Sequence, residues 1–269
     1  MQVKDYMKLK ISTIALLLFI LLLPGISKSA VRQDTIQYLA VSQSLLYAAR
    51  TGEQVKEFQQ LLEKADANQL HLQLINDNAK KAFWLNIYNA YVQLLLKENP
   101  GKYKKRGQFF GDKQIIIAGQ KLSLDKIEHG IIRHSKIKWS LGHLNKLFPG
   151  EFEKKARVNK VDYRIHFALN CGAKSCPPIA WYDAAKIDRQ LSLATKTYLK
   201  SEVIYDAQKN TVSLPAIMSW FRRDFGDKKK IKQLLREMQI IPAGTDPKIR
   251  FKKYDWTLFL SNYKTPDDE

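Results

Sequence analysis

The chain has 269 residues and a formal net charge of +19, and 11% of its residues are aromatic. This length suits one large domain or two small ones, and the aromatic content supports a sizeable core. The positive charge favours acidic partners, namely anionic lipid head groups, envelope polymers or nucleic acid. No nucleic-acid-binding motif accompanies the basic clusters, so we expect a solvated basic surface and no specific nucleic-acid partner.

Residues 1–29 have the pattern of a targeting segment. Lysines precede an apolar run from Ile11 to Leu23, which ends at Pro24 and is followed by small residues. The run is shorter than the roughly 20 residues that a membrane-spanning helix needs. We therefore expect a signal peptide cleaved after Ser29, with an uncleaved N-terminal anchor as the alternative. The mature chain, residues 30–269, would then be periplasmic or secreted, with no transmembrane span, and would form a single domain.

Apolar residues at helical spacing predict helices over 35–62, with a break near Gly52, and over 77–97. The second helix is apolar around most of its circumference and should lie at the centre of the core. Asn86, Asn89 and Gln93 place a polar stripe on one of its sides. Because a buried amide must be hydrogen-bonded, we expect the stripe to hold the backbone of a neighbouring loop. The alternative is that Asn86 assists an oxyanion in a catalytic site.

A short β-rich run over 114–118 precedes a predicted helix that begins at Ser123, which is a favourable N-cap residue. Asp125 and His129 lie four residues apart on this helix, with Glu128 beside them. A carboxylate within reach of His129 would fix its tautomer and raise its basicity. The alternative is an ordinary surface pair of little energetic value.

The stretch from Tyr163 to Pro178 contains both cysteines and is the densest in chemically reactive side chains. Its alternation of apolar and polar residues predicts a strand with His166 on one face and Cys171 on the other. A glycine-containing turn follows, from which Cys176 could reach back towards His166. Asp255, near the C-terminus, is a candidate partner for His166, although a turn or capping role is the simpler interpretation.

Three interpretations of the cysteines stay open. A Cys171–Cys176 disulfide is typical of an oxidising compartment and would shape the turn. Alternatively, either cysteine is a thiolate nucleophile with His166 or His129 as its base. A metal site of two cysteines and two histidines is disfavoured because the histidines are scattered along the chain, so neither a metal nor a cofactor is expected.

Four segments of the chain resemble the family known as domain of unknown function 547. They are AFWLNIYNA at 82–90, LSLDKIEHGIIR at 122–133, RIHFALNCGAKSCPP at 164–178 and, more weakly, YDWTL at 254–258. The resemblance implies no particular reaction. From this resemblance we also expect a distant likeness to papain-like and transglutaminase-like cysteine hydrolases.

The expected fold class is α+β, with a helical N-terminal half packed on a small β-sheet that contains the His166 strand. A helix over 183–199 and a hairpin over 203–214 are predicted in the rest of the chain.

Two functions are compatible with the sequence. The first is a cysteine-dependent hydrolase or acyl transferase acting on a peptide or cell-envelope substrate. In it Cys171 or Cys176 attacks, His166 or His129 is the base, Glu128 or Asp255 orients that base, and Asn86 assists the oxyanion. The second is a non-catalytic binding module with a Cys171–Cys176 disulfide and a basic surface for an envelope polymer or protein. A free, acidic thiol would favour the first function, and oxidised sulfurs would favour the second.

Overall fold

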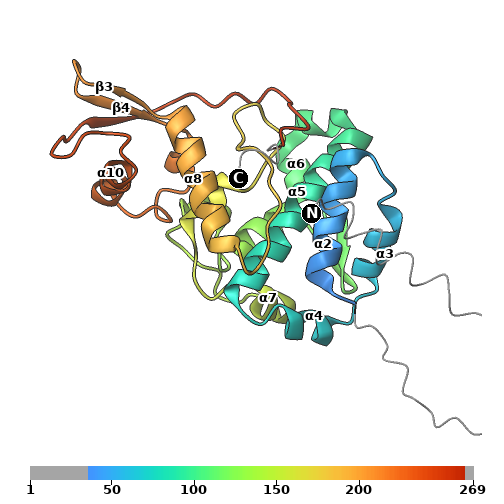
Figure 1. Cartoon of the computed structure of the whole chain (residues 1–269). Coiled ribbons are helices and arrows are strands. Elements are labelled where there is room, and N and C mark those ends of the chain that lie inside the picture. Colours follow the sequence, from blue (N-terminus) through green and yellow to red (C-terminus); the bar gives the residue numbers. More distant parts are fainter. Residues whose placement is uncertain (1–35, 264–269) are drawn as a thin grey trace, which may run out of the picture. The chain divides into compact units, whose positions relative to one another are not determined.

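The computed structural model describes residues 36–263 (Figure 1). The predicted signal peptide, residues 1–29, lies outside the described residues. The α-helices are α2 Tyr38–Thr51, α3 Lys56–Glu63, α4 Ala67–Gln73, α5 Asp77–Glu98, α6 Arg106–Gly111, α7 Glu151–Ala156, α8 Ile187–Glu202, α9 Ile217–Trp220 and α10 Lys228–Glu237. The tighter or wider helical turns are η1 Pro100–Lys105, η2 Lys126–Ile132, η3 Lys138–Ser140 and η4 Tyr163–Phe167. The strands are β1 Ile115–Ile117, β2 Gln120–Leu122, β3 Ile204–Asp206, β4 Thr211–Leu214 and β5 Lys248–Phe251.

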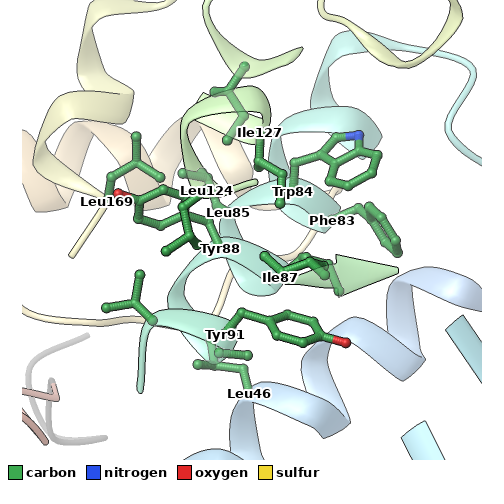
Figure 2. Close-up of a cluster of buried hydrophobic side chains, with 14 of the residues drawn as sticks. Leu46, Phe83, Trp84, Leu85, Ile87, Tyr88, Tyr91, Leu124, Ile127 and Leu169 are labelled. Atoms are coloured by element: carbon green, nitrogen blue, oxygen red, sulfur yellow. The ribbon is translucent and has the colours of Figure 1, made fainter. Parts of the chain in front are cut away.

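Helix α5 is the central element of the core, as the sequence predicts. The side chain of Asn76 caps its first turn by accepting a hydrogen bond from the Ala79 amide. The helix is buried on nearly all sides, and α2 packs along it. Figure 2 shows the cluster around α5, which is formed by residues that include Leu46, Phe83, Trp84, Leu85, Ile87, Tyr88, Tyr91, Leu124, Ile127 and Leu169. Burying so many large apolar side chains makes α5 the main source of hydrophobic stabilisation.

The polar stripe of α5 holds loop backbones. The amide of Asn86 donates to the Tyr182 carbonyl oxygen and accepts from the Tyr182 N–H. The amide of Asn89 donates to the carbonyl oxygen of Ala168 and accepts from the N–H of Asn170. The structural interpretation of the stripe is confirmed, because each amide satisfies buried backbone groups that have no secondary-structure partner.

The strands form two small sheets. Strands β1 and β2 pair antiparallel, with Ile115 opposite Leu122. The other sheet has the order β3-β4-β5, in which β3 and β4 form the predicted hairpin and β5 pairs parallel to β4. Figure 1 shows this sheet beside α8 and α10. The mixed helical and sheet content confirms the α+β class, and a second core cluster lies beneath this sheet.

The predicted His166 strand is wrong, and neither sheet contains His166. Residues Tyr163–Phe167 form the 3₁₀ turn η4, which begins where the Asp162 side chain accepts from the Arg164 amide. The Arg164 guanidinium also binds the Asp162 carboxylate and holds the turn closed. The apolar residues at alternate positions still find burial in a tight turn, because Ile165 enters the main core whereas Phe167 enters the second cluster. Alternation alone could not distinguish these arrangements.

Within residues 36–263, no helix combines the length and the apolar character required to cross a lipid bilayer.

Candidate functional site

A pocket of about 350 Å³ lies where η2, η4, α9 and the segments after η4 and β5 meet. Most of its lining is apolar and aromatic. Three tryptophans contribute to it, Trp139, Trp220 and Trp256. Of the candidate residues taken from the sequence, the lining includes Glu128, His129, His166 and Cys171. The fold therefore brings together, around one pocket, residues that are distant in the sequence.

A buried cluster of three side chains adjoins the pocket. His166 Nε2 lies 2.9 Å from Asp224 Oδ2, and the same carboxylate oxygen accepts from Arg133 Nε at 2.7 Å. The side chains of His166 and Asp224 are each 1% exposed, and that of Arg133 is fully buried. The Phe221 ring stacks on the His166 imidazole with centroids 4.0 Å apart, and the Arg133 guanidinium lies over the same ring.

The charges within this cluster balance. Burial lowers the pKa of His166 and outweighs the opposing effect of the Asp224 carboxylate. Burial alone would raise the pKa of Asp224, but hydrogen bonds from His166 and Arg133 hold it below its ordinary value. At neutral pH the cluster therefore contains a neutral imidazole, an ionised carboxylate and a guanidinium cation. A buried carboxylate paired with a buried guanidinium avoids an uncompensated charge.

His129 lies on the wide π-helical turn η2, a type of turn that is frequent at functional sites. The predicted cap is confirmed, since Ser123 Oγ accepts from the Lys126 amide. Arg133 Nη1 lies 2.9 Å from His129 Nδ1, so that nitrogen accepts and Nε2 carries the proton. His129 Nε2 is 3.6 Å from Asp125 Oδ1, and Nδ1 is 3.6 Å from Glu128 Oε1.

The expected rise in the basicity of His129 is wrong. Burial, followed by the charge of Arg133, lowers its pKa to about 3, although the Asp125 carboxylate acts in the opposite direction. His129 is therefore a neutral hydrogen-bonding group in the pocket wall and a weak base. Glu128 lies next to it and accepts a hydrogen bond from the Tyr88 hydroxyl at 3.3 Å.

The two cysteines form a disulfide, with their Cα atoms 6.1 Å apart. The backbone amides of Cys171 and Ala173 both donate to Cys176 Sγ. These hydrogen bonds hold the short loop that the disulfide closes. The Tyr254 hydroxyl is 3.1 Å from each sulfur. The disulfide interpretation is confirmed, and no free cysteine is left among the described residues.

No group of three or more His, Cys, Asp or Glu side chains in the described part of the chain is arranged to hold a metal ion. Both sulfurs are also bonded to each other, which removes the thiolate ligands that the two-cysteine, two-histidine hypothesis requires.

Three sequence candidates lie outside the pocket lining: Cys176, which is bonded to the lining residue Cys171, Asn86 and Asp255. Asn86 has its amide occupied by the Tyr182 backbone and by the Ser42 hydroxyl, so it has a structural role in this conformation. The Asp255 carboxylate accepts from the Thr257 amide, which is the turn role that the sequence also allowed. The carboxylate that binds His166 is Asp224 and not Asp255.

Sequence reasoning missed Asp224, Arg133 and Tyr254 as site residues. Asp224 is separated from His166 by 58 residues and belongs to no motif, so its pairing depends on tertiary structure. Arg133 ends the segment that contains His129 and could have been found, because a histidine and an arginine four residues apart on a helix can meet.

These features define a mixed helical and sheet protein with an aromatic pocket, a disulfide in the pocket wall and a buried histidine, aspartate and arginine cluster. Residues 72–199 match the family described as Protein of unknown function, DUF547, so this part of the chain belongs to that family. The matched range contains His129, His166 and both cysteines, whereas Asp224 lies beyond it. Comparisons with curated proteins and with solved structures gave no match. The distant likeness to papain-like and transglutaminase-like hydrolases stays a prediction.

Proposed function

We propose that this chain is an exported, non-catalytic binding module that holds a segment of an envelope polymer in the aromatic pocket. The Cys171–Cys176 disulfide in the pocket wall is the observation that carries the proposal, because neither bonded sulfur can act as a thiolate nucleophile. Asn86, the candidate for the oxyanion, is also occupied by backbone groups.

The pocket lining supports a ligand that has apolar faces as well as hydrogen-bond donors. Trp220 and Trp256 stack with their centroids 5.4 Å apart and present flat apolar surface. The carboxylates of Asp125 and Glu128 lie in the same lining and can accept hydrogen bonds. A mostly apolar cavity with a few convergent polar groups is typical of a ligand site. Sugar rings and amides of an envelope polymer offer both kinds of group.

A titration with soluble peptidoglycan fragments, followed by tryptophan fluorescence and calorimetry, tests this proposal. We expect saturable binding that weakens at least tenfold in a Trp256→Ala variant, because part of the aromatic surface is lost. Phe259→Ala is the matched control, since Phe259 is 49% exposed and does not line the pocket. Equal affinities of the Trp256→Ala variant and the unmodified chain would contradict the proposal, as would the absence of binding by any fragment.

A second candidate is cysteine-dependent hydrolysis or acyl transfer after the disulfide is reduced. Cys171 and His166 line the same pocket, and Asp224 fixes His166 through Nε2, which is the observation that favours it. A dithiol reductant would convert the disulfide to two thiols and itself become a disulfide. Cys171 would then attack a substrate carbonyl as His166 takes the thiol proton, His166 would return that proton to the departing amine or alcohol, and water or another acceptor would cleave the resulting thioester.

Intact-mass analysis with iodoacetamide, with and without prior reduction, separates the two candidates. The binding-module proposal predicts that alkylation adds mass only after reduction. In the reduced protein, rapid alkylation near pH 6 would show a thiol of depressed pKa and would favour the second candidate. If the reduced thiols react no faster than an ordinary thiol of pKa about 8.5, the hydrolase is rejected.

A further inference from the structure

The loop from Trp139 to Phe148 exposes an unusual amount of apolar surface. Trp139, Leu147 and Phe148 are 76%, 86% and 93% exposed, and Leu141 and Leu144 are 40% and 50% exposed. Isolated exposed apolar residues are common on protein surfaces, but five within ten residues of chain form a patch of the kind that marks an interaction site.

The loop has a defined conformation, so its exposed side chains are presented in a fixed arrangement. The Ile137 amide donates to the Leu144 carbonyl oxygen, and the Lys146 amide donates to the Ser135 carbonyl oxygen. Ser140 Oγ donates to the Ile137 carbonyl oxygen and accepts from the Leu144 amide. These hydrogen bonds satisfy the backbone within the loop while the apolar side chains face solvent.

Basic residues lie within and beside the loop. The segment 134–150 contains three lysines, at 136, 138 and 146, and no acidic residue. Lys138 pairs with Asp125 and Lys146 with Glu153, yet these lysine side chains are 53% and 40% exposed. Arg222 and Arg223 are exposed, and the Arg223 amide donates to the Leu141 carbonyl oxygen, which places this basic pair beside the loop.

We propose that the Trp139–Phe148 loop inserts into the interface of an anionic lipid bilayer. Tryptophan and phenylalanine favour the boundary between head groups and acyl chains, where leucine side chains are also buried. Lysine and arginine beside such an insertion contact anionic head groups. An apolar surface on a folded protein would equally suit a protein partner, but the exposed lysines and arginines within and beside the loop favour a negatively charged lipid surface. Because Trp139 and Leu141 also line the pocket, the pocket would lie near the lipid head groups.

Vesicle binding of the full chain tests the proposal. Sedimentation is measured with phosphatidylcholine vesicles and with vesicles that also contain phosphatidylglycerol. We expect a Leu147→Ser/Phe148→Ser variant to bind the anionic vesicles at least tenfold more weakly than the unmodified chain. The matched control is Ile204→Ser/Phe251→Ser, because these residues are 60% and 38% exposed and belong to strands β3 and β5. We expect this control to bind as the unmodified chain does, and circular dichroism verifies that each variant is folded.

A local probe separates the loop from any other lipid-binding segment, including the apolar run at the N-terminus. A polarity-sensitive fluorophore is attached at Leu147→Cys or, as the control, at Ile204→Cys on strand β3. We expect a blue shift with anionic vesicles only for the first.

Three results would overturn the proposal. The first is no shift at Leu147→Cys, and the second is equal binding of the loop variant. The third is a loop-dependent dimer in sedimentation analysis without lipid, which would assign the patch to a second copy of the chain. If phosphatidylcholine vesicles alone bind as tightly as the anionic ones, the role of charge is rejected.

Discussion

Asp224 is the residue on which the buried charge cluster depends. Its carboxylate accepts hydrogen bonds from both His166 and Arg133, and it is the acidic partner of a fully buried guanidinium. Removing one member of a buried ion pair is much more costly than replacing both members, because the remaining charge stays uncompensated in a medium of low dielectric constant.

We therefore expect Asp224→Asn to lower the free energy of unfolding by about 3–5 kcal/mol. Urea denaturation measures the change. The control is Asp255→Asn, since Asp255 is exposed and its carboxylate accepts only a turn hydrogen bond from Thr257; about 1 kcal/mol or less is expected there. Equal losses in the two variants would show that Arg133 is stabilised by other means.

Histidine titration should begin to destabilise the fold at a higher pH than carboxylate titration does. The pKa of His129 is lowered from 6.5 to about 3, with burial as the main cause, and the pKa of His166 is lowered as well. Between pH 6.5 and 3 the unfolded chain binds a proton at His129 that the folded chain does not bind. The free energy of unfolding therefore falls as the pH decreases from about 6.5 towards 3. Above pH 6.5 both states contain neutral His129, and this contribution is constant.

We expect His129→Gln to reduce the loss of stability between pH 6.5 and 4, because glutamine can accept from Arg133 but does not titrate. The difference is on the order of a few kcal/mol at the acidic end. Chemical denaturation at several pH values provides the measurement. His143→Gln serves as the control, since His143 is exposed. If the His129→Gln variant loses as much stability at low pH as the unmodified chain, His129 does not cause the loss, and its pKa in the folded state is not lowered.

Most reactive residues of the site could be predicted from the sequence, but their partners could not. The segment around His166, Cys171 and Cys176 combines rare residue types at short spacing, which is visible without a structure. Asp224 pairs with His166 only through tertiary folding. The sign of the His129 pKa shift also required the structure, because burial decides it and sequence indicates only which charges are close along the chain.

At the scale of elements, the side chain of Asn89 fixes the segment that leads from His166 to Cys171. It replaces the hydrogen bonds that a neighbouring strand would supply, by binding the carbonyl oxygen of Ala168 and the amide of Asn170. Because Asn89 is fully buried, these two backbone groups would have no solvent access if the amide were removed.

We expect Asn89→Ala to destabilise the chain by about 2–4 kcal/mol, because each unsatisfied buried group costs about 1–3 kcal/mol. Thermal and urea unfolding measure the change. Asn78→Ala is a matched control on the same helix, at an exposed position, and should be neutral or slightly stabilising because alanine is the better helix former. A neutral Asn89→Ala variant would mean that water satisfies the two backbone groups.

Helix α5 was predictable because its apolar pattern extends over many residues, and the hairpin was predictable because a polar turn separates two short β-rich runs. The α5 prediction from 77 to 97 corresponds to the observed Asp77–Glu98, and the hairpin corresponds to β3 and β4. The short alternation over 164–170 failed because the hydrogen bonds of Asp162 and Asn89, which are side-chain interactions, decide the backbone conformation there. A π-helical turn at η2 was likewise not predictable, since the capping pattern at Ser123 is the same for an α-helix.

At the scale of the whole described fold, the C-terminal segment connects two hydrophobic cores. Tyr254 packs against both clusters and places its hydroxyl against the disulfide. The segment then continues along the main core, where the Phe259 amide donates to the Gly172 carbonyl oxygen and the Ser261 amide donates to Gln93 Oε1. The region around β3, β4 and β5 is therefore coupled to α5 partly through this one strip of chain.

Tyr254→Ala should weaken both cores at once. We expect a loss of about 3–5 kcal/mol, as for a large aromatic residue removed from a core. Tyr254→Phe keeps the ring and loses only the contacts of the hydroxyl with sulfur, which is a weak acceptor, so about 1 kcal/mol or less is expected. Urea unfolding followed by circular dichroism and by tryptophan fluorescence gives both magnitudes.

In the unmodified chain the two signals should change together, because the shared ring couples the clusters, and in Tyr254→Ala the transitions should separate. Coincident transitions in Tyr254→Ala would show that other contacts are sufficient to couple the cores, and a large loss in Tyr254→Phe would assign the stabilisation to the hydroxyl and not to the ring.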